Sequence, residues 1–188
     1  MAGSNEVLLV RHGETDDNAT GRVQGRRDTQ LNDRGREQSL ALAGMLRDEG
    51  VRALYTSPLQ RARATAQIVG DVLGLEPVVD ERLIEADTGD WSGRLIAEVI
   101  AAEPEGWRRW RAADPAFRFP NGESVAEQAR RVAAALADVA GGPLPALVVT
   151  HGGSIRAVAG VERSPGVAVG NCALFRLPAV SPATSPRP

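Results

Sequence analysis

Residues 7–13 read Val-Leu-Leu-Val-Arg-His-Gly, and residues 146–153 repeat the pattern as Ala-Leu-Val-Val-Thr-His-Gly-Gly. A short apolar run with β-branched residues that ends near glycine is typical of a buried strand. His12 and His151, the only histidines of the chain, therefore each stand where a buried strand gives way to a loop. In open α/β sheets, ligands bind at this edge, beyond the carboxyl ends of the strands. A lone histidine is more often structural, but two in matched settings favour a functional role.

The rest of the chain alternates predicted helices with short predicted strands. Apolar residues at helical spacing predict helices at about 35–49, after Ser57, within 93–111, over 124–140 and from Ser154. Further strands are predicted at 51–56, about 77–79 and about 172–177. Ser57 and Pro58 have the order of a helix start, with serine as N-cap and proline next. The alternation predicts an α/β fold, a three-layer αβα sandwich with a mostly parallel central sheet.

Length and composition are those of an ordinary globular domain. The 188 residues are enough for one full core, and length favours a single domain over two. With 43% hydrophobic residues and a net charge of −2, nothing indicates a nucleic-acid or membrane partner. We expect one domain over 1–177 and a disordered proline-rich tail over 178–188.

Some classes of chemistry are excluded by what the sequence lacks. Cys172 is the only cysteine, so no disulfide framework or thiolate metal cluster is expected. The absence of lysine excludes a lysine nucleophile or Schiff base. Residues 1–10 do not resemble a signal peptide, and no apolar run is long enough to cross a bilayer. We therefore expect a cytoplasmic protein.

Two arginines near the predicted strand ends indicate an anion site. A guanidinium at Arg11 beside the imidazole of His12 is poor structural design unless an anion lies between them. Arg61 falls in the first turn of a predicted helix, where a cation opposes the helix dipole at a cost of about a few tenths of a kcal/mol. A solvated side chain or a nearby acid would explain Arg61 equally well. A phosphate would explain both arginines, because guanidinium groups bind it in bidentate fashion, and His151 would add a donor.

The motifs of the chain, taken in order, resemble those of the histidine phosphatase (phosphoglycerate mutase-like) superfamily. The matching blocks are Arg11-His12-Gly13-Glu14-Thr15 followed by Asn18, Gly21-Arg22, Gln24-Gly25 and Asp28, Ser57-Pro58-Leu59-Gln60-Arg61-Ala62 with Thr65-Ala66, Leu83-Ile84-Glu85 with Gly89-Asp90-Trp91-Ser92-Gly93, Gly122-Glu123-Ser124, His151-Gly152-Gly153-Ser154-Ile155-Arg156-Ala157 and Asn171-Cys172-Ala173. An Arg-His-Gly triplet alone is weak evidence. The ordered set covers most of residues 6–177 and is specific.

The resemblance implies a role for each matching position. His12 would be the nucleophile that becomes phosphohistidine, with its other ring nitrogen donating to a fixed acceptor. Arg11, Arg61 and His151 would hold the phosphoryl oxygens and offset charge in the transition state. Neutral contacts to the same group are expected from Asn18, Gln24, Gly25 and Gly152.

The resemblance also selects the acid of the site. Glu85 would protonate the leaving alkoxide and then activate water. From the residues alone, Glu81, Asp87 and Asp90 are rivals, and each could simply be solvated surface. We expect no metal and no cofactor, because two histidines without clustered carboxylates make a poor ligand set.

The region at about 90–120 is expected to form a cap over the site, as in similar family members. Side chains that would line the cap are Trp107, Trp110, Phe117 and Phe119, with Arg108, Arg109 and Arg111 meeting an acidic substrate. The alternative is that the aromatic residues form core and the arginines a solvated face. Only about a dozen residues separate Ala157 from Asn171, so the resemblance also implies an altered rim or dimer surface there.

These features predict a phosphoric monoester hydrolase, a metal-independent phosphomonoesterase that acts on a small phosphorylated metabolite. In the family's cofactor-dependent mutases the acid is followed by Arg-His-Tyr-Gly and a long insertion shields the site. Here Glu85 precedes Ala86-Asp87-Thr88-Gly89 and the chain is short, which disfavours the mutase alternative. A non-catalytic phosphate-binding pseudoenzyme is disfavoured because the nucleophile, clamp and acid are all present. Sugar phosphates, phosphoglycerate derivatives and α-ribazole phosphate stay open as substrates, and so does a homodimer.

Overall fold

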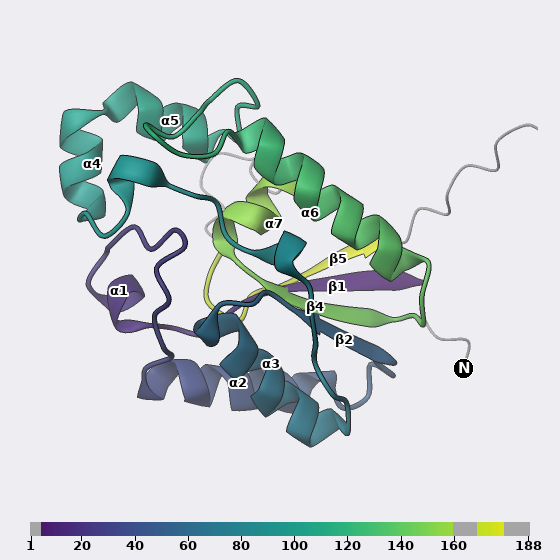
Figure 1. Ribbon diagram of the computed structural model, residues 1–188. Helices are drawn as coiled ribbons and strands as arrows, with labels where there is room; N and C mark the ends of the chain where they lie inside the picture. Colours follow the sequence, from purple (N-terminus) through teal and green to yellow (C-terminus); the bar gives the residue numbers. More distant parts are fainter. Residues whose placement is uncertain (1–4, 160–168, 179–188) are drawn as a thin grey trace, which may run out of the picture.

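A central sheet with helices on both faces organises the molecule (Figure 1). The computed structural model describes residues 5–159 and 169–178. Its strands are β1 (Glu6–Arg11), β2 (Ala53–Thr56), β3 (Val78–Val79), β4 (Ala146–Thr150) and β5 (Leu174–Pro178). They lie in the order β3-β2-β4-β1-β5, with β5 antiparallel to β1 and the other pairs parallel. The predicted three-layer α/β fold is confirmed.

Seven α-helices occur in the described residues. They are α1 (Asp16–Ala19), α2 (Asp33–Leu46), α3 (Gln60–Leu73), α4 (Ile96–Ala102), α5 (Pro104–Arg111), α6 (Val125–Ala140) and α7 (Gly152–Ala159). Single 3₁₀ turns at Glu81–Leu83 and Gly89–Trp91 interrupt the segment between β3 and α4. No helix in this part of the chain combines the length and apolar character of a membrane span.

Each face of the sheet has its own hydrophobic core, because side chains alternate along a strand. Leu8 and Val10 of β1 pack with the buried side chains of α2 and α3. Val7 and Leu9 point to the other face, where they pack with α6 and α7. All five residues of β4 are buried, as expected for a parallel strand covered on both sides.

This arrangement creates a crevice at the carboxyl ends of β1 and β4. The two strands are parallel neighbours, with Arg11 in register with Thr150. The long helix after β1, α2, packs on one face, whereas α7, which follows β4 directly, packs on the other. Ligands bind at such a switch point in open α/β sheets. His12 and His151 are the first residues beyond the two strands.

A third cluster of buried apolar residues lies apart from both sheet cores. Its members are Val23, Ala86, Trp91, Val99, Phe117, Phe119 and Val125. Trp91 is fully buried at its centre and contacts four other aromatic rings at centroid distances of 5.2 to 6.3 Å. In Figure 1 helices α4 and α5 lie at one end of the molecule, beside the loop that holds α1.

The helix after Ser57 does not begin as predicted. Helix α3 starts at Gln60 with Leu59 in the N-cap position, and no side chain caps it. The hydroxyl of Ser57 instead shares a 2.6 Å hydrogen bond with Nε2 of the buried His151. The local start signal at Ser57 is overridden here by a partner that lies just beyond the end of β4. By contrast, Ser124 caps α6 through a capping box with Glu127, so the helix predicted over 124–140 is confirmed.

Two expectations fall on segments outside the described residues. Residues 160–168 make up most of the stretch between Ala157 and Asn171, and residues 179–188 make up nearly all of the expected tail. The altered rim and the disordered tail stay predictions, as does the division of the chain into one domain with a cap.

Candidate active site

The two histidines predicted from the strand ends lie together at the crevice. Their ring centroids are 5.2 Å apart and the rings are tilted by 58°. His12 is 2% exposed and His151 is fully buried. Burial lowers the pKa of both imidazoles well below 6.5, and the nearby charge of Arg61 lowers the pKa of each further. Both rings are therefore neutral at neutral pH.

The hydrogen bonds of His12 fix its tautomer. Nδ1 lies 2.7 Å from the carbonyl oxygen of Gly13, which can only accept, so Nδ1 carries the proton. Nε2 accepts a 3.2 Å hydrogen bond from Nε of Arg61. The lone pair of Nε2 thus points toward the arginine. A neutral imidazole with its free nitrogen fixed beside a cation is the arrangement that a nucleophile toward an anion requires.

Arg61 is held in place from three directions and is almost completely buried. Besides its bond to His12, its guanidinium donates to the carbonyl oxygens of Arg27, at 2.6 Å, and Gly25, at 2.8 Å. Burial lowers the pKa of Arg61 to about 10, so the group stays charged at neutral pH. These partners are neutral, and a buried charge with neutral partners favours an anionic ligand. The solvated-arginine alternative is therefore wrong.

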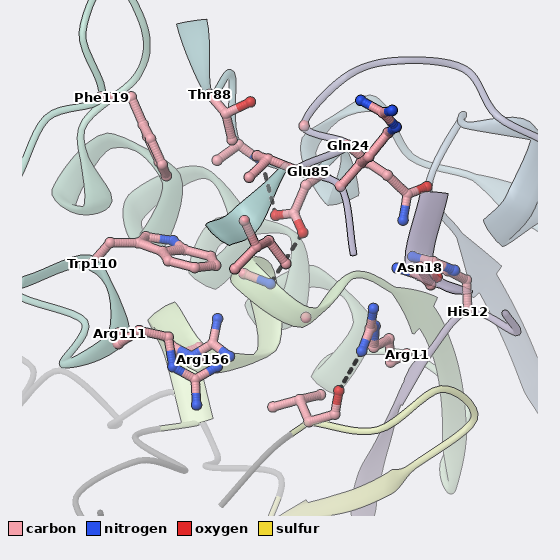
Figure 2. A pocket seen from close by; sticks show the side chains of 18 of the residues that line it. Arg11, His12, Asn18, Gln24, Glu85, Thr88, Trp110, Arg111, Phe119 and Arg156 are labelled. Carbon is pink, nitrogen blue, oxygen red and sulfur yellow. Dashed lines mark hydrogen bonds between the residues drawn. The ribbon is translucent and has the colours of Figure 1, made fainter. Parts of the chain in front are cut away.

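Arg11 is a second cation of the same site, and its side chain is half-buried. One of its terminal nitrogens donates to the carbonyl oxygen of Val169 at 2.6 Å (Figure 2). Its Nε is buried and has no hydrogen-bond partner among the described residues. Burial also lowers its pKa. Two guanidinium groups therefore lie close to neutral imidazoles, as the sequence predicted for an anion site.

Two side-chain amides present their nitrogens to the cavity because their oxygens are already occupied. The oxygen of Asn18 accepts a 3.1 Å bond from Asn171 and a 3.3 Å bond from the backbone N–H of Thr15. The oxygen of Gln24 accepts from Thr29 at 2.6 Å. Each amide is left with N–H donors, which are suited to an anion. The sequence did not predict a role for Asn171 in orienting Asn18. The two residues are 153 positions apart, so no local sequence pattern indicates their hydrogen bond.

Glu85 lies in the same cavity, and its carboxylate is held by several donors. Both of its oxygens carry hydrogen bonds that Figure 2 shows, from the backbone N–H of Ala86 at 2.9 Å and of Gly153 at 3.0 Å. The backbone of Glu85 is held by Arg131, whose guanidinium also pairs with Glu123 at 2.7 Å. Of the four acids weighed in the sequence, Glu85 alone lines the cavity, whereas Glu81, Asp87 and Asp90 do not.

The cavity holds about 210 Å³ and brings together most of the predicted site residues. Its lining includes Arg11, His12, Asn18, Arg22, Val23, Gln24, Gly25, Arg61, Glu85, Ala86, Thr88, Ile96, Trp107, Trp110, Arg111, Phe119, Gly152, Gly153, Arg156 and Val169. His151 is not among these lining residues; its ring lies beside that of His12, and its Nδ1 is buried without a hydrogen-bond partner among the described residues. In Figure 2 the side chains of Arg11, His12 and Asn18 gather at one end, and those of Trp110, Arg111 and Arg156 at the other.

The predicted aromatic and arginine lining is correct only in part. Phe117 packs inside the aromatic cluster and does not line the cavity. Arg108 pairs with Glu105 on the surface at 2.6 Å, and Arg109 pairs with Asp114 at 2.7 Å. Helical spacing alone did not reveal which face of α5 is turned to the site.

Arg156 lines the cavity although no role was predicted for it. It is 5% exposed, and its guanidinium lies 4.9 Å from the ring centroid of Trp110, within cation–π distance. The sequence feature that could have indicated a role for Arg156 is its position in the matching block that begins at His151.

No group of three or more histidine, cysteine, aspartate or glutamate side chains suited to a metal ion occurs among the described residues. The site can instead hold a tetrahedral anion through arginine and amide donors. The neutral imidazole of His12 and the carboxyl group of Glu85 line the same cavity. Together with the sheet order, these features are those of an α/β protein of the phosphoglycerate mutase-like class.

Comparison with known families agrees with this class. The sequence model of the histidine phosphatase superfamily (branch 1) matches residues 7–174. The chain therefore belongs to the histidine phosphatase superfamily, and the resemblance identified from its motifs is confirmed.

Relatives of the chain include both phosphatases and proteins named as mutases. Phosphoserine phosphatase 1 of Hydrogenobacter thermophilus is 40% identical over 134 residues, which cover 71% of this chain and 64% of that protein. A probable phosphoglycerate mutase GpmB of Klebsiella pneumoniae is 40% identical over 151 residues, or 78% of this chain and 69% of that protein. The chain thus spans about two thirds of the length of these curated relatives.

Solved structures match over more of their length. A mycobacterial glucosyl-3-phosphoglycerate phosphatase, determined with VO3, is 32% identical with a TM-score of 0.81, and the match covers 91% of this chain and 90% of that one. Bacillus stearothermophilus YhfR is 31% identical with a TM-score of 0.74, covering 85% and 81% of the two chains. The predicted enzyme class, a phosphatase-type hydrolase, agrees with the phosphatases among these relatives.

Proposed function

We propose that this protein is a metal-independent phosphomonoesterase that hydrolyses a small phosphorylated metabolite through a phosphohistidine on His12. The observation that carries the proposal is the fixed tautomer of His12. Its Nδ1 donates to Gly13, and its Nε2 lone pair faces Arg61. The names of the phosphoserine and glucosyl-3-phosphoglycerate phosphatases add support.

In the first step, Nε2 of His12 attacks phosphorus and the bond from phosphorus to the alkoxide oxygen breaks. Arg11 and Arg61 bind the equatorial oxygens, and their charge offsets the charge that these oxygens carry. The amides of Asn18 and Gln24 donate to the same group. Glu85 gives its proton to the alkoxide as it leaves.

In the second step, water attacks the phosphohistidine. The carboxylate of Glu85 takes a proton from the water as its oxygen bonds to phosphorus and the bond to His12 breaks. Inorganic phosphate leaves, and both side chains return to their starting protonation states. His151 lies 5.2 Å from His12 between ring centroids, its Nε2 is bonded to Ser57 and its Nδ1 has no hydrogen-bond partner among the described residues, so we assign Nδ1 a supporting contact to the phosphoryl group.

The proposal is tested by turnover of p-nitrophenyl phosphate without added metal. Wild-type protein should release nitrophenolate, and His12→Ala should reduce the rate to background. Acid-labile, alkali-stable label on residue 12 after quenching with labelled substrate is the expected intermediate. Equal rates from the two proteins would favour a phosphate-binding pseudoenzyme.

Phosphoglycerate mutase activity is a second candidate, favoured by the names of the GpmB relatives. A mutase must shield the phosphoenzyme from water and return the group to a product. The test is 3-phosphoglycerate with a bisphosphoglycerate primer. We expect little 2-phosphoglycerate, and rapid isomerisation would favour the mutase.

The natural substrate is to be sought by a screen of phosphorylated metabolites ranked by kcat/KM. Phosphoserine, phosphoglycerate derivatives, sugar phosphates and α-ribazole phosphate belong in that screen. A cytoplasmic location, a homodimer and the absence of nucleic-acid or membrane partners stay predictions of the same proposal.

A further inference from the structure

Helix α6 carries a polar side chain where its buried face would be expected to be apolar. Gln128 is 1% exposed and lies on the same face as Val132 and Ala135, which belong to a sheet core. A buried amide is costly unless its hydrogen bonds are satisfied. The cost of burying this amide therefore depends on which acceptors its N–H groups bind.

The side-chain nitrogen of Gln128 has two acceptors, one on Glu85 and one on a residue that contacts the backbone next to Glu85. Nε2 lies 2.8 Å from Oε1 of Glu85 and 3.3 Å from the hydroxyl of Ser154. The same hydroxyl donates to the carbonyl oxygen of Ile84 at 3.3 Å, so its lone pair is available to accept from Gln128. The amide of Gln128 is thus directed at the carboxylate of Glu85 and at the backbone just before it.

The two carboxylate oxygens of Glu85 accept different numbers of hydrogen bonds. Oε1 accepts two hydrogen bonds, from Gln128 and from the backbone N–H of Ala86. Oε2 accepts one, from the backbone N–H of Gly153. A carboxylate oxygen has about two lone-pair positions. Both positions of Oε1 are therefore taken, whereas Oε2 keeps one that can bind a proton.

We propose that Gln128 is a positioning residue for proton transfer: its amide holds Oε1 of Glu85, so that Oε2 is the oxygen that exchanges the proton. The inference rests on the proposed function, in which Glu85 is the acid and base. When the ester is cleaved, the Oε2–H bond breaks as the alkoxide gains the proton. When water attacks, its proton bonds to Oε2 and the starting state returns.

A dependence on the leaving group distinguishes this role from a structural one. An alkoxide is a poor leaving group and needs its proton, whereas p-nitrophenolate leaves without one. General acid catalysis typically contributes about 10²–10⁴-fold to a rate, and a misplaced acid loses part of that. Comparing kcat/KM for phosphoserine or glycerol phosphate with that for p-nitrophenyl phosphate isolates the first step, because the later attack of water does not enter kcat/KM.

The variant is Gln128→Met, which keeps the length of the side chain and removes both donors. We expect kcat/KM for the alkyl phosphate to fall by about 10-fold or more, and that for p-nitrophenyl phosphate by no more than about 2-fold. Gln128→Leu serves as a second variant if the first folds poorly. Val132→Ala is the matched control, because it weakens packing one turn along the same helix and should leave the ratio of the two rates unchanged.

A double variant completes the test. In a Glu85→Gln background, Gln128→Met should cause no further loss, because the group it positions can no longer supply a proton. Equal losses on both esters, or additive losses in the double variant, would overturn the inference. If wild-type turnover of both esters did not depend on His12, the proposed function and this inference would fail together. If turnover depends on His12 but the loss is uniform, the inference alone fails.

Discussion

The two buried neutral histidines predict a marked loss of stability in mild acid. The pKa of each imidazole is lowered well below 6.5 by burial and by the charge of Arg61. In the unfolded chain both titrate near pH 6.5. Below that pH the unfolded state binds protons that the folded state excludes, so stability is complete above pH 6.5 and falls as the pH is lowered.

The expected size follows from linkage. At pH 5.5, one unit below the unfolded pKa, each histidine that stays neutral in the fold costs about 1.4 kcal/mol, so the pair costs about 2.8 kcal/mol. Carboxylates contribute little in this window, because the shifted ones have lowered pKa values, as for Asp80 and Glu127, and titrate at lower pH.

Urea unfolding at pH 7.5 and 5.5 in phosphate-free buffer measures this loss. The free energy of unfolding should fall by about 2.8 kcal/mol in the wild type, by about half of that in His12→Gln or His151→Gln, and hardly at all in the double variant. Each protein is its own reference, so lower stability of a variant does not affect the comparison. A double variant that keeps the wild-type loss would refute the reasoning.

Three further outcomes follow from the site. Arg61→Lys should lower kcat/KM by about 10²–10³-fold, because an ammonium cannot replace three directed bonds, while Arg34→Lys on the surface should be neutral in the same assay. Gly25→Ala should lower the free energy of unfolding in urea more than Gly21→Ala does. Both glycines have a positive φ, but only at Gly25 would an added Cβ lie 2.2 Å from the hydroxyl oxygen of Thr88. Equal losses in the two variants would contradict this. Burial raises the pKa of Cys172 to about 11, so its thiol should react slowly with a disulfide reagent at pH 8 until the protein unfolds; rapid reaction of folded protein would count against it.

The local sequence predicted those parts of the site that depend on strand ends. His12, His151 and Arg11 were placed correctly because a buried strand followed by glycine fixes where its last residues lie. Family motifs then selected Glu85 and Arg61, and the structure brings both to the same crevice.

Other parts of the site could not be predicted, because they depend on contacts between distant segments. Ser57 has the local pattern of a helix cap, but its hydroxyl bonds to His151, which is 94 positions away. Gln128 reads as one polar residue in a helix, and only the packing of α6 against Glu85 gives it a partner. Arg108, Arg109 and Arg111 are neighbours in sequence, yet of the three only Arg111 faces the cavity.

The aromatic cluster around Trp91 shares no buried residue with the two sheet cores. Although its member Ala86 donates a hydrogen bond to Glu85, the cluster contributes no residue to the packing of β1 and β4. Under the proposed function, a different leaving group would be accommodated by substitutions at Trp107 or Trp110, which line the cavity and belong to neither sheet core, rather than by changes beside His12. In the proposed mechanism, this separation would let the part of the cavity that meets the leaving group vary while His12, Arg11 and Arg61 are kept.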